Sequence, residues 1–143
     1  MRGIEIMSYK EELLKQLAVL LKKRGCRKSK QTWTKRVDGL VLLLNIQNSQ
    51  FSAEAYYINL GILIEPLNKD GKSACLTNCH IIERIPECDK EGNAFSAENI
   101  ASIFDRWEEW YGTMDKLKDK AIKGSLPRQT WGTAWTYLTT YRG

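Results

Sequence analysis

The sequence predicts an α+β domain, in which a mostly antiparallel sheet of about four or five strands is packed by an N-terminal and a C-terminal helix. Three observations support this class. Apolar residues recur at helical spacing near both ends, the middle of the chain carries runs rich in strand-forming residues, and an Asp-Gly pair separates two of those runs. A chain of 143 residues fits one domain, so we expect residues 1–143 to form a single unit.

The first helix is predicted over Ser8 to Arg24. Ser8 and Glu11 have the spacing of a capping box, and the helix carries one apolar stripe, formed by Leu13, Leu17, Leu20 and Leu21. Gly25 follows a basic last turn, as is typical of a helix C-terminus. Residues 1–7 are too short and too acidic for a signal peptide, and we expect them to be a frayed extension.

A β-hairpin is predicted next. Thr32 to Val37 is rich in strand formers, and Leu40 to Gln47 is the return strand. Asp38 and Gly39 between them favour a two-residue type I′ turn, which needs positive φ at both positions. The return strand begins with five apolar residues, which indicates that both of its faces are covered.

Two more strands are predicted, over Ala55 to Glu65 and Cys79 to Ile85. The first of them alternates, with one apolar face formed by Tyr56, Ile58, Leu60, Ile62 and Ile64. Asn48 to Ala53 is expected to be a loop, and Pro66 and Pro86 end the two strands.

The second helix is predicted to begin at Ser96, with Asn99 at the third position of the cap. Its apolar stripe continues from Ile100 to Leu117, so one long helix ending near Gly124 and Pro127 is expected. The tail over residues 130–141 fits either a helix or a strand. Its threonines and aromatic residues slightly favour a strand.

Charge is unevenly distributed along the chain, whose formal net charge is +5. Ten basic residues lie between Lys10 and Arg36 and are opposed by two glutamates, whereas residues 83–119 contain ten acids and five bases. A charged face of this kind steers partners. No apolar run approaches the ~18 residues of a membrane span. We therefore expect a cytoplasmic protein that does not associate with a membrane.

Five features of the chain occur in the same order as in a known family. They are Gly25 after the leading helix, Trp33, Asn45 to Gln47, Tyr56 to Gly61, and Cys79 to Ile85. On these features the chain resembles the bacterial domain-of-unknown-function family 4304 (DUF4304) over roughly Tyr9 to Trp110, with residues 124–143 outside the match. Cys26 is a departure, because the family pattern usually has an aromatic residue there. The family has no assigned activity, so the resemblance implies a fold more than a function.

The resemblance also suggests that Gln47, Asn59, His80 and Arg84 lie together in space. Amides inside a sheet cost roughly 1–3 kcal/mol each when unpaired, so they either complete the scaffold or line a site. We expect them to complete the scaffold. The alternative is a pocket that orients a carboxylate or phosphate, in a small-anion or metabolite binder or an enzyme. No complete catalytic motif is present in the sequence.

The four cysteines are expected to be free thiols, as is usual in a cytosolic protein. Two alternatives involve His80, the only histidine. Cys75, Cys79, His80 and Cys88 are zinc-ligand types, but they lack the usual Cys-x2-Cys spacing. A nucleophile pair could instead join Cys75 or Cys88 to His80. We predict neither a metal nor a cofactor.

The strongest charge feature is the segment from Lys22 to Lys30, in which six of nine residues are basic. Its candidate binding residues are Lys22, Lys23, Arg24, Arg27 and Lys28. Trp110 is a further candidate, as an interface anchor. Our first hypothesis is a non-enzymatic domain that binds an acidic protein partner, as an immunity protein or inhibitor does. The second is a nucleic-acid-associated module that uses residues 22–36. Self-association as a homodimer is also open.

Overall fold

The computed structural model describes residues 9–50, 55–86 and 94–140, and its fold is α+β, as predicted. One antiparallel sheet of six strands has the strand order of the chain, so each strand pairs with the next. The strands are β1 (Arg27–Ser29), β2 (Thr32–Val37), β3 (Leu40–Asn48), β4 (Tyr56–Ile64), β5 (Ile81–Ile85) and β6 (Gln129–Thr130). The short outer strands β1 and β6 were not predicted, and they raise the count from four or five to six.

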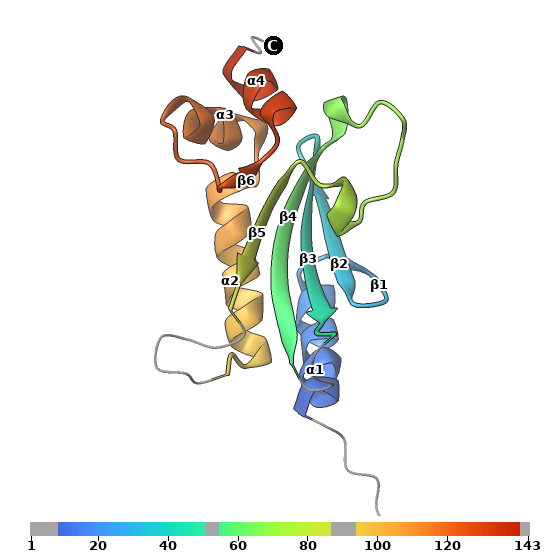
Figure 1. The fold of residues 1–143 in the computed structure, drawn as a ribbon. Helices are drawn as coiled ribbons and strands as arrows, with labels where there is room; N and C mark the ends of the chain where they lie inside the picture. Colours follow the sequence, from blue (N-terminus) through green and yellow to red (C-terminus); the bar gives the residue numbers. More distant parts are fainter. Residues whose placement is uncertain (1–8, 51–54, 87–93, 141–143) are drawn as a thin grey trace, which may run out of the picture.

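The helices cover one face of the sheet, called here the inner face (Figure 1). There α1 (Tyr9–Lys23) and α2 (Ala97–Tyr111) pack against each other. Beyond the end of α2, α3 (Met114–Ile122) packs against α4 (Gly132–Thr140). The opposite, outer face is partly covered by residues 65–80, which include the 3-10 turns η1 (Glu65–Leu67) and η2 (Leu76–Asn78).

The two faces of β3 have separate apolar clusters. On the inner face the even-numbered residues Leu40 to Ile46 join the main core with the α1 and α2 side chains. On the outer face Val41 and Leu43 pack with Leu63 and Cys79 in a smaller cluster. The prediction that this strand is covered on both sides is therefore confirmed.

The prediction for the first helix included a signal at each end. At its C-terminus, Gly25 has φ +84°, and the Cys26 and Gly25 amides donate to the carbonyls of Leu21 (3.1 Å) and Lys22 (3.0 Å). This pair of bonds is a Schellman motif, so the predicted glycine stop is confirmed. The predicted cap at Ser8 and the extension over residues 1–7 lie outside the described residues.

The hairpin between β2 and β3 follows the prediction closely. Asp38 and Gly39 have φ values of +50° and +76°, as a type I′ turn requires. The turn also supports a helix far away in sequence, because Asp38 Oδ2 accepts a hydrogen bond of 2.8 Å from the backbone amide of Met114 at the start of α3.

The single long C-terminal helix was a wrong prediction. The capping box of Ser96 and Asn99 is present, but α2 ends at Tyr111 and α3 starts after Thr113. The Thr113 hydroxyl accepts from the Lys116 amide (3.1 Å), which makes it the cap of a new helix. The apolar stripe hid this break because Met114 and Leu117 serve a second helix on the same core.

The strand preference for the tail was also wrong, because residues 132–140 form α4. Ala134 and Leu138, four residues apart, are buried against the core. The Thr139 and Thr140 hydroxyls donate to main-chain carbonyls of the preceding turn, including those of Trp135 and Thr136. Threonine can satisfy its hydroxyl within a helix in this way, so its strand propensity is overridden by packing.

Candidate binding surfaces

A row of polar side chains crosses four strands on the outer face. Thr32, Asn45, Asn59 and Arg84 are direct neighbours in the strand register. Asn45 Nδ2 donates to Thr32 Oγ1 (2.9 Å), and Asn59 Nδ2 donates to Asn45 Oδ1 (3.1 Å). Each polar group thus finds its partner on the adjacent strand, which fixes the register of this part of the sheet.

Arg84 closes the row. Its Nε donates to Asn59 Oδ1 (3.1 Å) and its Nη2 to Gln47 Oε1 (2.9 Å), while Asn59 Nδ2 also donates to Gln47 Oε1 (3.0 Å). The guanidinium lies over the Tyr57 ring, 4.4 Å from its centroid. Gln47, Asn59 and Arg84 therefore lie together, as the resemblance implied. Asn59 is buried, whereas Gln47 and Arg84 are exposed, so the group forms part of a sheet surface and does not converge in a deep cleft.

His80 lies elsewhere, which corrects the expected grouping of four residues. Its backbone amide donates to Ile62 O and its Nδ1 accepts from Ile64 N, both at 2.9 Å. Arg84, which pairs with Asn59, lies four residues after His80. Because an extended strand rises about 3.3 Å per residue, His80 is separated from the polar row along the strand direction. Burial lowers the pKa of His80, so the neutral imidazole that accepts the Ile64 hydrogen bond is favoured.

The alternative zinc site has no support in the described part of the chain, where no group of three or more histidine, cysteine or acidic residues could hold a metal ion. Cys88 lies outside that part. Cys79 is buried beside Gly61, and burial raises the pKa of its thiol to about 12.

The Cys-His nucleophile pair is not assembled from Cys75. The Cys75 Sγ lies 3.2 Å from Thr77 Oγ1 and accepts from Asn78 Nδ2 at 3.2 Å, and the Thr77 hydrogen bond is the main cause of its lowered pKa. The His80 Nδ1 is occupied by the Ile64 amide. The imidazole nitrogen that would accept the thiol proton therefore already accepts a hydrogen bond from the backbone.

The predicted basic region is divided in two by the fold. Three of its residues pair with acids from distant segments, through Arg24 with Asp105 (2.7 Å), Lys35 with Glu108 (2.9 Å) and Arg36 with Glu65 (2.8 Å). Arg24 and Asp105 make two hydrogen bonds, and this contact raises the pKa of Arg24. Arg24 therefore joins α1 to α2, which corrects its assignment as a free binding residue.

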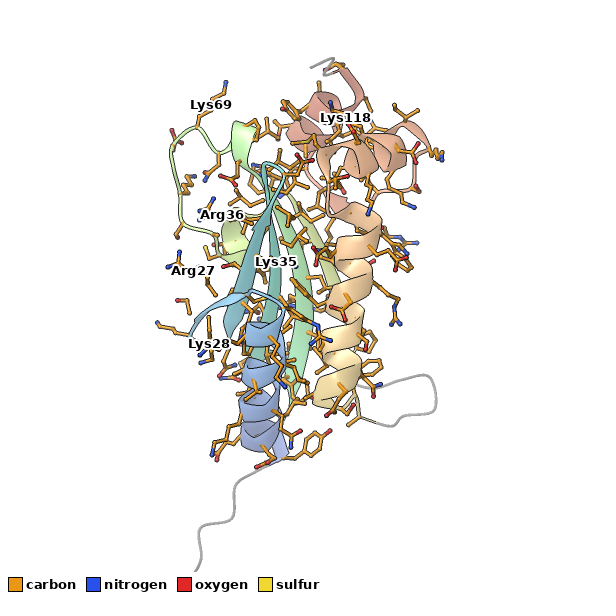
Figure 2. The ribbon with its side chains drawn as sticks, turned by 180° about the vertical axis from the view of Figure 1, so that it is seen from behind. Arg27, Lys28, Lys35, Arg36, Lys69 and Lys118 are labelled. Carbon is orange, nitrogen blue, oxygen red and sulfur yellow. The ribbon has the colours of Figure 1, made fainter. Side chains whose placement is uncertain are left out.

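The other basic residues remain uncompensated, and we call them the basic corner: Lys22, Lys23, Arg27, Lys28 and Lys30. All five are exposed, and none forms an ion pair within the described residues. Lys28 Nζ lies 5.9 Å from the centroid of the Trp33 ring. Figure 2 shows Arg27 and Lys28 beside α1, on the side away from α2. β1, missed in the sequence because it has only three residues, positions these side chains.

An open groove adjoins the basic corner, between α1 and the strands β1 and β2. Its volume is about 650 Å³. Leu14, Ala18 and Val19 of α1 and Trp33 of β2 provide its apolar lining, and its basic lining residues are Lys15, Lys28 and Lys30. Part of this groove is visible in the sequence, since Leu14 and Ala18 flank the buried stripe of α1.

Trp110 is half exposed, in agreement with its prediction as a surface aromatic residue. It lines a hollow of about 250 Å³ between α2 and β5, together with Trp107, Ile103 and Glu83. Burial raises the pKa of Glu83. Trp107 is buried, and its Nε1 donates to Gly61 O (3.1 Å), so it belongs to the core. Trp110 can therefore contact a partner without disturbing the helix packing.

Comparison with known proteins identifies the family. The model of the domain of unknown function DUF4304 matches residues 17–127, which extends beyond Trp110 through α3. Searches of the curated proteins and of the solved structures found no match. Among the described residues, no helix has the length and apolar character needed to cross a bilayer. Since the match covers most of the chain, the protein belongs to the DUF4304 family.

Proposed function

We propose that this domain is a non-enzymatic protein-binding module, immunity-like or inhibitor-like, which uses its basic corner to bind the acidic surface of a partner. The observation that carries the proposal is the division of the basic region. Fold-stabilising pairs neutralise Arg24, Lys35 and Arg36, whereas the basic corner forms no ion pair with the part of the chain that the structure describes. Exposed charge of one sign steers a complementary partner and raises its association rate.

A protein partner is favoured over a nucleic acid by the surroundings of the charge. Single-stranded nucleic acids stack on exposed aromatic rings, but Trp33, the aromatic residue within the basic region, is only 1% exposed. The basic corner adjoins an apolar groove, and the charged phosphate backbone of a nucleic acid has no apolar groups to bury there. Trp110 offers a second, aromatic contact.

The cytoplasm is the compartment that we propose. The described cysteines, Cys26, Cys75 and Cys79, are all free. Free thiols are usual where glutathione and thioredoxin keep proteins reduced. An acidic cytoplasmic protein is therefore the kind of partner to seek.

Charge reversal tests the function. The variant Lys23→Glu/Lys28→Glu is compared with Lys69→Glu/Lys116→Glu, which makes the same change at exposed lysines outside the basic corner. Partners captured from the native host are identified by mass spectrometry, and binding of the purified partner is then measured by calorimetry. We expect the first variant to bind about tenfold or more weakly, which is 1.4 kcal/mol, and the control to bind like wild type.

Nucleic acid provides the contrary outcome. Binding of labelled duplex and single-stranded DNA and RNA is measured by anisotropy between about 50 and 200 mM salt, where phosphate contacts give a steep dependence. Steep binding that is lost in Lys23→Glu/Lys28→Glu, together with protein capture that is unchanged in that variant, would overturn the proposal in favour of a nucleic-acid module.

A further inference from the structure

The helix layer on the inner face leaves one side of α1 uncovered. On one side, α1 packs against α2 and is joined to it by the Arg24–Asp105 pair. On the other side the described chain places no helix beside β1 and β2. Figure 2 shows the two helices next to each other, with Arg27 and Lys28 on the strand beyond α1. Among the described residues, that side of α1 is therefore open to a partner.

The uncovered side is apolar. Leu13, Leu17 and Leu21 of α1 are buried in the core, but Leu14 and Ala18 are only partly buried and Val19 is 56% exposed. Together with Trp33, which is itself almost fully buried, they line the groove of about 650 Å³. An apolar groove of this size beside a helix is typical of a surface that another chain covers.

The charges around the groove define the chemistry of that chain. Lys15, Lys28 and Lys30 line it, and the last two belong to the basic corner. Glu11 is the one acidic residue in its lining. An occupant that fills the apolar floor and approaches these lysines must be apolar on one side and acidic at the margins.

We propose that this groove binds an amphipathic helix of the partner protein, with acidic residues flanking its apolar stripe. A helix that packs on α1 at the usual 8–10 Å would become the third helix of the layer. The groove is open and covers one side of its occupant, whereas small-molecule sites enclose most of the ligand surface. This inference rests on the proposed function and adds the structural class of the ligand.

Synthetic peptides test the helix requirement. The probe is a labelled peptide of about 18 residues, or five turns, with leucine at i, i+3, i+4 and i+7 spacing and glutamate on both flanks of the stripe. Its control is a scrambled peptide of the same composition, in which the leucines no longer share a face. By fluorescence anisotropy we expect the amphipathic peptide to bind about tenfold or more tightly than the scrambled one.

Matched variants locate the site. Val19→Glu introduces a negative charge into the groove at an exposed position, where folding should be retained, and circular dichroism checks this. Ile122→Glu makes a comparable change on α3 at a residue that is 73% exposed and does not line the groove. We expect Val19→Glu to weaken peptide binding about tenfold or more and Ile122→Glu to leave it unchanged.

Three results would overturn the groove inference. The first is equal binding of the amphipathic and scrambled peptides, and the second is equal peptide binding by Val19→Glu and wild type. The third is that a long-chain fatty acid binds in the groove and the amphipathic peptide does not. The proposed function is judged separately by polyglutamate. If polyglutamate binds and Lys23→Glu/Lys28→Glu abolishes that binding, the basic corner retains its role even when the helix inference fails. If neither polyglutamate nor the captured protein depends on the basic corner, the proposed function itself fails.

Discussion

The two faces of the sheet are stabilised by different physical means. On the inner face, alternate residues of β3 and β4 meet the apolar stripes of α1 and α2, so burial of apolar surface dominates. On the outer face, the half near residues 65–80 has a small apolar cluster, and the other half has the hydrogen-bonded row from Thr32 to Arg84. β3 and β4 change from apolar to amide side chains at Asn45 and Asn59, where this cover ends.

The hydrogen bonds of the row give Asn45, Asn59 and Arg84 a part in pairing the strands. An exposed apolar strand surface promotes aggregation. A row of amides instead gives each strand a specific partner and leaves a polar surface that water can hydrate. We expect the inner face to tolerate changes that conserve volume, and the outer face to depend on individual hydrogen bonds. Substitutions on the two faces should therefore differ in character as well as in size.

The largest effect is expected for Asn59→Ala. Asn59 is 1% exposed and makes three side-chain hydrogen bonds, to Asn45, Gln47 and Arg84. Its removal leaves these partners with fewer bonds, and one of them is charged, so a loss of about 3 kcal/mol is expected in urea unfolding. Asn45→Ala is the control. Asn45 is only partly buried and water can replace its bonds, so a loss of about 1 kcal/mol is expected. Equal losses would show that burial of the amide is irrelevant.

The next effect concerns Gly61, where the outer face comes closest to its cover. A Cβ at this position would lie 2.7 Å from Cys79 Sγ and 3.5 Å from Leu43 Cδ2. We expect Gly61→Ala to lower the free energy of unfolding by about 2 kcal/mol through overpacking. The double variant Gly61→Ala/Cys79→Ala removes the sulfur and should recover part of that loss, whereas additive losses in a double-mutant cycle would contradict a clash with Cys79.

The inner face was the more predictable of the two from sequence. The stripe of α1, the alternation of β4 and the turn at Asp38 and Gly39 depend on local periodicity or on backbone conformation, and all are confirmed. The predictions failed at the break between α2 and α3, although Thr113 gives it a local signal, because its hydroxyl accepts from the Lys116 amide. A remote contact adds to this cap, since Asp38, 76 residues away from Met114, accepts from the Met114 amide, and no local pattern contains that bond.

The candidate sites show the same limit. Gln47, Asn59 and Arg84 could be grouped because strand register brings them together, but His80 was placed with them wrongly because its position four residues away along β5 was not considered. The basic segment was visible in the sequence. Its division into paired and unpaired residues was not, because Asp105, Glu108 and Glu65 come from distant elements.

A pair of tryptophans extends the comparison to the hydrogen bonds of the inner face. Trp33 and Trp107 are both almost fully buried, but only Trp107 has an acceptor for its Nε1, whereas the Trp33 Nε1 has none within the described residues. Substitution of either tryptophan by phenylalanine removes a similar apolar area, together with the indole Nε1–H donor. We expect Trp107→Phe to be about 1 kcal/mol more destabilising than Trp33→Phe in thermal and urea unfolding. The reverse order would show that packing differences outweigh the bond to Gly61.

The smallest effect is a pH dependence that originates at His80, where the sheet passes into its cover. Burial holds the pKa of His80 below the ordinary value of 6.5, so between these two pKa values the folded chain binds fewer protons than the unfolded chain. Stability from this group is therefore complete above pH 6.5 and declines as the pH falls below it, because protonation of Nδ1 would break the bond from the Ile64 amide.

Urea unfolding of wild type and His80→Gln between about pH 5 and pH 7.5 measures this loss, which we expect to be below about 1 kcal/mol. Glutamine can accept from the Ile64 amide without titrating, so the variant should show a flatter pH profile. Glu83 contributes in the opposite direction, because burial raises its pKa, but it is present in both proteins and cancels in the difference. Parallel profiles would mean that the folded structure accommodates the charged imidazole, and that protonation of His80 does not cost the hydrogen bond from the Ile64 amide.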